Sequence, residues 1–253
     1  MHAKHHQEVL GIYMQFSGAT HTGKNITVAM IDTGIAGNQL SQVVAGWKIR
    51  VAHDGSIQPL PSLEDPLGRG TELARCLLDV APQVHLIGVD IFNSQYKTNS
   101  ELLAVGIGQA LLCKPDVICV CVQSFNLEKR YLFDSVIAKA REHNVIVVAC
   151  ASTDKMSFPA HINGVVPVVS HPSCSEKYYQ YDVQFWKEKP LSGGIYIADG
   201  HHNGKYLGAE VATARLAGEI ACLRSVPSLQ YAAATDIVDV LQQRAVLLFE
   251  NMA

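Results

Sequence analysis

The chain has 253 residues, of which 48% are hydrophobic and 17% charged, and its formal net charge is -3. This length allows one large α/β domain, and this composition excludes an intrinsically disordered chain. No run of basic residues indicates nucleic acid, and no apolar run reaches the length of a membrane span. We therefore expect neither nucleic acid nor a membrane as a partner.

Along the chain, short apolar runs alternate with segments of helical periodicity. We predict helices at 71–80, from Ser100, which we expect to be the cap, to 111, and at 133–143. We predict buried strands at 26–31, 85–90, 117–122, 145–149 and 165–169. Strands that are apolar on both faces and separated by helices predict a parallel sheet that is covered on both sides.

The predicted fold class is therefore α/β, a three-layer parallel-sheet fold. Because no Pro/Gly/Ser-rich linker divides the chain, we expect a single domain at 24–253, with an N-terminal extension at 1–23 that packs on it. The stretch 172–194 has little periodicity but carries several aromatic residues. For it we favour a hairpin or loop packed on the core over an exposed aromatic surface. Its aromatic residues are Tyr178, Tyr179, Tyr181, Phe185 and Trp186.

The cysteines and the start of the chain indicate the compartment. The seven cysteines are odd in number, and most stand in apolar segments such as 119–121 and 148–150. Thiols spread in this way fit a reducing environment better than a disulfide framework. The polar start also lacks the apolar stretch of a secretory signal. We therefore expect a cytoplasmic protein. The absence of a CxxC pair argues against zinc held by thiolates, and we expect no metal and no other cofactor.

Functional groups in open α/β sheets lie beyond the carboxyl ends of the strands. Asp32 follows the first predicted strand and is itself followed by Thr33-Gly34. Gln123 and Ser124 follow the third strand, and 152–154 follow the fourth. An aspartate before Thr-Gly is a weak signal by itself, because it also suits a turn.

The order of several segments, however, resembles the subtilase family of serine proteases. Residues 28–35 are similar to the family's aspartate motif, 68–74 to its histidine motif and 208–218 to its serine motif. Between these, further segments are similar to the family's GVAP turn, its substrate-lining strand, its oxyanion-hole strand and the region that follows, at 79–82, 115–123, 144–153 and 158–168. The resemblance covers most of 24–245 and implies a subtilisin-like fold.

The resemblance also implies that the catalytic groups are replaced. Asp32 stands at the position of the family's acid, but Arg69 stands at that of the histidine and Glu210 at that of the serine. Thr153 stands where the family has its oxyanion-hole asparagine. A guanidinium stays protonated near neutral pH and cannot act as a base. We therefore expect a pseudoenzyme of the serine endopeptidase family, with an Asp32–Arg69–Glu210 ion cluster in place of the triad.

Peptide binding can outlast this loss, because subtilases hold an extended peptide through backbone groups at two strand edges. By the resemblance, we expect these two edges at Lys97, Thr98 and Asn99 and at Val122, Gln123 and Ser124. The leading hypothesis is a pseudoprotease that binds a peptide or a partner enzyme. The maturation of a ribosomally made peptide natural product is the context that the family suggests.

Two alternatives stay open. One is an enzyme with new chemistry at the old site, using Glu210 with Asp32 or a cysteine such as Cys150 or Cys174. The other is a structural subunit, for instance a homodimer that uses the aromatic segment as its interface.

Overall fold

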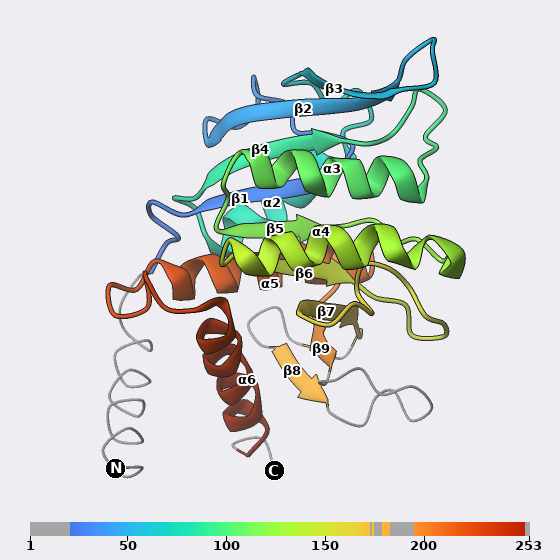
Figure 1. Ribbon diagram of the computed structural model, residues 1–253. Coiled ribbons are helices and arrows are strands. Elements are labelled where there is room, and N and C mark those ends of the chain that lie inside the picture. Colours follow the sequence, from blue (N-terminus) through green and yellow to red (C-terminus); the bar gives the residue numbers. More distant parts are fainter. Residues whose placement is uncertain (1–20, 173, 175–178, 183–194, 251–253) are drawn as a thin grey trace.

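The computed structural model describes residues 21–172, 174, 179–182 and 195–250, and the account below is confined to them. A mostly parallel sheet forms the middle of three layers, with helices on both faces (Figure 1). This arrangement confirms the predicted α/β fold class. Within the described residues no helix has both the length and the apolar character needed to cross a membrane.

The sheet has nine strands within the described part of the chain, in the order β3-β2-β4-β1-β5-β6-β7-β9-β8. They are β1 (Thr27–Asp32), β2 (Val43–Val51), β3 (Ile57–Pro61), β4 (His85–Asp90), β5 (Val117–Val120), β6 (Ile146–Cys150), β7 (Val165–Ser170), β8 (Tyr179–Asp182) and β9 (Ile195–Ala198). A separate hairpin consists of β10 (His201–His202) and β11 (Lys205–Tyr206). The helices are α2 (Arg69–Val80), α3 (Ser100–Leu112), α4 (Arg130–Glu142), α5 (Ala209–Arg224) and α6 (Ala234–Glu250).

The sheet is parallel except at its two edges. Seven strands, from β2 to β9 in the sheet order, pair in parallel, whereas β3 and β8 pair antiparallel with β2 and β9. The outer strand β3 was not predicted, because its sequence Ile-Gln-Pro-Leu-Pro contains two prolines and four of its five residues are exposed. Proline is tolerated in a sheet mainly on edge strands, which fits this position.

Two smaller expectations also change. The cap of α3 is Asn99, whose side chain accepts a hydrogen bond from the backbone N–H of Leu102, while Ser100 is the first helical residue. The aromatic stretch is packed where the structure describes it. Tyr179 is buried, and the ring of Tyr181 lies 4.8 Å from that of Tyr196. Tyr178, Phe185 and Trp186 lie outside the described residues, as does most of the predicted extension at 1–23.

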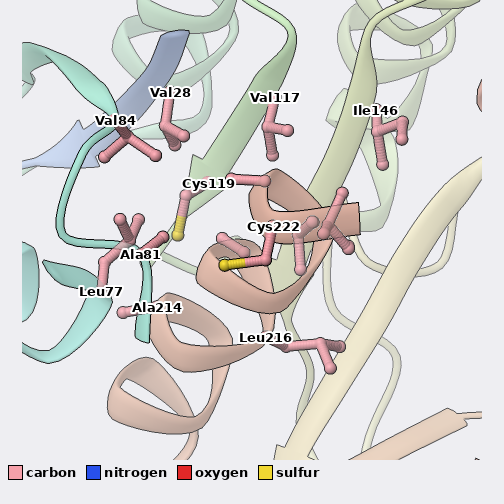
Figure 2. Packing of buried hydrophobic residues seen from close by; sticks show 14 of the residues in the cluster. Val28, Leu77, Ala81, Val84, Val117, Cys119, Ile146, Ala214, Leu216 and Cys222 are labelled. Atoms are coloured by element: carbon pink, nitrogen blue, oxygen red, sulfur yellow. The ribbon is translucent and has the colours of Figure 1, made fainter. Parts of the chain in front are cut away.

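Each face of the sheet carries its own hydrophobic core. Helices α3 and α4 cover one face, and α2 and α5 cover the other (Figure 1). On the second face, Leu77 and Ala81 from α2 and its end approach Ala214 and Cys222 of α5, with Cys119 of β5 beneath them (Figure 2). Helix α5 is therefore a central, buried element, and its first turn is held rigidly at the carboxyl ends of β1 and β5.

Candidate functional site

The three residues predicted to form the ion cluster come from three different elements. Asp32 is the last residue of β1, Arg69 is the first residue of α2, and Glu210 is the second residue of α5. Both helices start at the edge of the sheet where the parallel strands end, which is where α/β proteins assemble their sites. The fold thus brings together residues that are up to 178 positions apart in the sequence.

The ion cluster is present in the structure. Nη1 of Arg69 lies 2.9 Å from Oδ2 of Asp32, and Nη2 of Arg69 lies 3.2 Å from Oε1 of Glu210. Nη2 also donates to the backbone carbonyl of Cys121, at 3.2 Å. Arg69 therefore bridges both carboxylates with the two terminal nitrogens of its planar guanidinium.

Asp32 is the most buried member, with 1% of its side chain exposed. Burial raises its pKa from 3.8 to about 7, although the charge of Arg69 and the backbone N–H of Thr33 act to lower it. The contact with Arg69 is a close ion pair whose N–H groups are not aimed at the carboxylate. Neither oxygen of Asp32 accepts a hydrogen bond of good geometry from a described residue. Desolvation is larger than the two effects that oppose it, the charge of Arg69 and the backbone N–H of Thr33, so the pKa of Asp32 rises.

Arg69 and Tyr96 face each other at the open side of the cluster. Burial by itself would lower the pKa of Arg69, but the charges of Asp32, Tyr96 and Glu210 raise it above its ordinary value. Arg69 also acts as a hydrogen-bond partner of the Tyr96 side chain, whose ring stacks on Phe92 with centroids 4.9 Å apart. Arg69 is thus a permanent cation and cannot serve as a general base.

A third carboxylate, Asp65, organises the backbone around the cluster and was not predicted from the sequence. Its Oδ1 accepts hydrogen bonds from Thr33 Oγ1 at 2.8 Å and from the Gly68 N–H at 2.9 Å. Its Oδ2 accepts from the N–H and the hydroxyl of Thr71, both at 2.7 Å. Asp65 therefore caps the start of α2 from outside the helix. An aspartate three residues before a helix-starting glycine is the only local signal for it.

The close approach of α2 to the turn after β1 depends on Gly70. A Cβ atom placed on Gly70 would lie 2.0 Å from the carbonyl oxygen of Gly34, which is backbone and cannot give way. The N–H of Gly70 in turn donates to Thr33 Oγ1 at 2.8 Å. Glycine at this position lets Arg69 come within reach of Asp32.

The predicted peptide edges are partly engaged within the protein. Ser124 pairs with Phe158 through both of its backbone groups, at 2.9 and 2.8 Å, so it could pair with a peptide only by breaking this bridge. On the other edge, the backbone of Lys97 is hydrogen-bonded to Asn93 and the side chain of Asn99 caps α3. Thr98 has a buried hydroxyl that makes no hydrogen bond to the described residues.

Gln123 lies close to the cluster. Its side chain forms a hydrogen bond with the thiol of Cys150, and its Oε1 is buried without a hydrogen-bond partner among the described residues. Thr153, the predicted oxyanion position, is exposed, and its hydroxyl donates to the neighbouring Asp154 at 2.9 Å. Gln123 therefore presents a side-chain amide beside Cys150, whereas the hydroxyl of Thr153 is engaged by Asp154.

The alternative nucleophiles are poorly suited to attack. Cys150 is fully buried, and burial together with the charge of Glu210 raises its pKa well above the usual range. Burial also raises the pKa of Cys174. Thr213 is buried and donates its hydroxyl back to the carbonyl of Ala209 at 2.6 Å. Because a thiolate is the reactive form of cysteine, these groups have the properties of core residues.

A cavity of about 230 Å³ adjoins the cluster, between α2, α5 and the β10–β11 hairpin. His202 of the hairpin lines it, and His202 Nε2 lies 3.5 Å from Oε2 of Glu72 on α2. The neighbouring His201 is held through Nδ1 by the buried Asp199, at 2.6 Å, and Asp199 also pairs with Arg215 of α5. The hairpin is therefore fastened to both helices beside the site.

Comparison with known proteins agrees with this geometry. No model of a known protein family matches the chain. The minor extracellular protease Epr of Bacillus subtilis (strain 168) is 25% identical over 160 residues, which is 58% of this chain but only 23% of Epr. Among solved structures, a lanthipeptide protease superimposes with a TM-score of 0.64 at 16% identity, covering 89% of this chain and 81% of its own. The fold is that of the subtilisin-like proteases.

Two further solved structures have this subtilisin-like fold. The S41 psychrophilic protease and sphericase each superimpose with a TM-score of 0.68, at 18% and 19% identity. Each match covers 88% of this chain and 84% of the other. The likeness therefore extends over most of the chain.

Proposed function

We propose that this chain is a non-catalytic member of the subtilisin-like proteins and that it binds a peptide segment without cleaving it. The observation that carries the proposal is the bridging of Asp32 and Glu210 by Arg69. By the motif resemblance, these residues stand at the positions of the acid, the serine and the histidine. A permanent cation occupies the place of the base, and a carboxylate paired with it occupies the place of the nucleophile.

The chemistry of peptide hydrolysis supports the same proposal. The serine mechanism needs a nucleophile, a base to take its proton, and donors for the oxyanion. Arg69 cannot accept a proton, and Glu210 lacks a hydroxyl to activate. Loss of one triad member already lowers the rate by several orders of magnitude, so the loss of two leaves no route through this mechanism.

The proposed biological setting is the maturation of a ribosomally made peptide in the cytoplasm. It is supported by the structural likeness to a lanthipeptide protease and by the free, mostly buried cysteines. A new enzyme at the same site is less well supported, because Glu210 is engaged by Arg69 and the pKa values of Cys150 and Cys174 are raised.

Hydrolysis and binding are tested separately. For hydrolysis, the purified protein is incubated with a fluorophosphonate probe and with unfolded casein, and an active subtilisin serves as the positive control. We expect neither labelling nor cleavage, and either one at a rate that scales with protein concentration would contradict the proposal.

For binding, an equimolar pool of synthetic peptides is incubated with the protein, and the bound fraction is identified by mass spectrometry. Gln123→Trp places bulk at the predicted peptide edge, whereas Leu112→Trp places the same bulk on an exposed position of α3 and is the control. We expect intact peptides to be recovered with the wild type and the control but not with Gln123→Trp. Equal recovery with all three proteins, or none with any, would contradict peptide binding in the cleft.

A further inference from the structure

The cavity beside the ion cluster is lined by apolar, acidic and basic groups, and the basic ones, Arg69 and His202, each lie against one of its two carboxylates. Leu73, Leu207 and Val211 supply apolar surface from α2, from the end of the hairpin and from α5. Glu72 and Glu210 supply two carboxylates from the two helices. A space with an apolar wall and acidic groups is complementary to a side chain that has an alkyl stem and a cationic head.

The ion cluster itself is short of hydrogen-bond donors. One guanidinium, that of Arg69, serves two carboxylates. Its contact with Glu210 is made to Oε1, and within the described part of the chain no hydrogen bond reaches Oε2. Asp32 is 1% exposed, yet neither of its oxygens accepts a well-formed hydrogen bond from a described residue. Asp32 does not line the cavity, so Oε2 of Glu210 is the acceptor of the cluster that a cation in the cavity could reach.

The second carboxylate, Glu72, has only exposed or weak partners. Its Oε1 lies 3.2 Å from Nε of Arg75 and its Oε2 lies 3.5 Å from Nε2 of His202. The side chains of Glu72 and Arg75 are 52% and 37% exposed, so this pair contributes little and is easily exchanged. Glu72 is therefore available to a cation that enters the cavity.

We infer that this cavity receives the lysine or arginine side chain of the bound peptide, with the cationic head near Glu210 and Glu72. The alkyl stem lies against Leu73, Leu207 and Val211. The inference rests on the proposed function, because it needs a peptide in the cleft, and it adds a requirement for one basic residue. A neutral side chain of the same length would fill the apolar part but leave the carboxylates without a partner.

The test compares two acetylated and amidated alanine hexapeptides, which differ only in one residue, lysine or norleucine. Affinities are measured by fluorescence anisotropy at low ionic strength. We expect the wild type to bind the lysine peptide about five- to tenfold more tightly, with the preference shrinking in high salt. Glu72→Gln and Glu210→Gln should each reduce the preference, whereas Glu142→Gln, an exposed carboxylate of α4, should keep it. Glu72→Gln changes an exposed residue, so it keeps the test decisive if Glu210→Gln is poorly folded.

Each outcome decides the inference and separates it from the proposed function. A lysine preference that is lost in Glu72→Gln supports it. Equal binding of both peptides overturns the basic-residue requirement but leaves peptide binding intact. A lysine preference that survives both glutamate variants places the cation elsewhere and overturns this site. Binding of neither peptide, at any salt concentration, overturns both proposals.

Discussion

Nη1 of Arg69 lies 2.9 Å from Oδ2 of Asp32, but the arginine side chain is 28% exposed and the aspartate only 1%. The pair is therefore asymmetric: the cation is partly hydrated, whereas the anion is almost fully desolvated. This asymmetry explains why burial can raise the pKa of Asp32 to about 7 even next to a guanidinium. The free energy of unfolding should consequently depend on pH through Asp32.

Asp32→Asn should flatten that dependence. Because the pKa of Asp32 is higher in the folded state, the folded protein binds the proton more tightly than the unfolded chain does. The contribution of Asp32 is then fully favourable below pH 3.8 and is lost as the pH rises to about 7. As the pH rises between these limits, the free energy of unfolding of Asp32→Asn should increase relative to that of the wild type by up to roughly 4 kcal/mol.

Urea unfolding at pH 4 and at pH 7.5 measures this difference, with Asp134→Asn, an exposed carboxylate of α4, as the control. If the difference in the free energy of unfolding between Asp32→Asn and the wild type is the same at both pH values, Asp32 does not titrate between them and its pKa is not raised by folding.

Arg69→Met should destabilise the protein in the opposite part of the pH range. Above pH 7 the ionised Asp32 would be left buried without its counterion, which costs about 3 kcal/mol, near the lower end for a broken buried pair because Arg69 is partly exposed. Near pH 5 the carboxyl group is protonated and most of the cost disappears. Unfolding curves at the two pH values check this, and the double variant Asp32→Asn/Arg69→Met should recover stability above pH 7. A cost that is independent of pH would show that Arg69 acts through packing alone.

Asp65→Ala should lower the free energy of unfolding by more than the partial exposure of Asp65 suggests. It removes the acceptor for the N–H groups of Gly68 and Thr71 and for two hydroxyls, so α2 loses its cap and Arg69 its fixed position. We expect a loss of about 2 kcal/mol in thermal or urea unfolding. The neighbouring Glu64→Ala, which alters an exposed side chain, should be nearly neutral. Equal effects of the two substitutions would remove Asp65 from this role.

Thiol reactivity distinguishes the binding protein from a cysteine enzyme. Cys113 is partly exposed, whereas the other six cysteines are buried, and burial raises the pKa of Cys76 and Cys222 to about 12. With iodoacetamide at pH 8, we expect rapid modification of Cys113 only, and Cys113→Ser should abolish it. Fast modification of Cys150 or Cys174 in the native protein, located by peptide mapping, would instead favour covalent chemistry at the site.

Much of the fold follows from sequence pattern, because its central strands are buried on both faces and read as unbroken apolar runs. The strands at 85–90 and 165–170 were located within one residue for this reason. Strand β2 was missed, since its residues alternate between buried and partly exposed positions and include Lys48 and Arg50. Both cations contact Asp90, which lies beside Asp32 in the sheet. That pairing is a tertiary relationship with no local signal.

The ion cluster could be predicted because each member stands in a motif whose order along the chain is specific. The residues that surround the cluster could not be predicted in this way. Asp65 acts through backbone groups of residues on both sides of it, and Gln123 reaches Cys150 through the fold alone. The cavity depends on how the hairpin at 201–206 lies against α2, which the sequence of the hairpin does not encode by itself.

The prolines of the outer strand β3 bear on how this protein meets a partner. Pro59 and Pro61 stand opposite Ile49 and Trp47, so two of the five residues of this edge have no N–H to donate. A second strand that approached β3 from outside would meet an incomplete row of N–H donors and could not form a continuous hydrogen-bonded ladder with it. The sheet is thereby guarded against self-templated growth on this side.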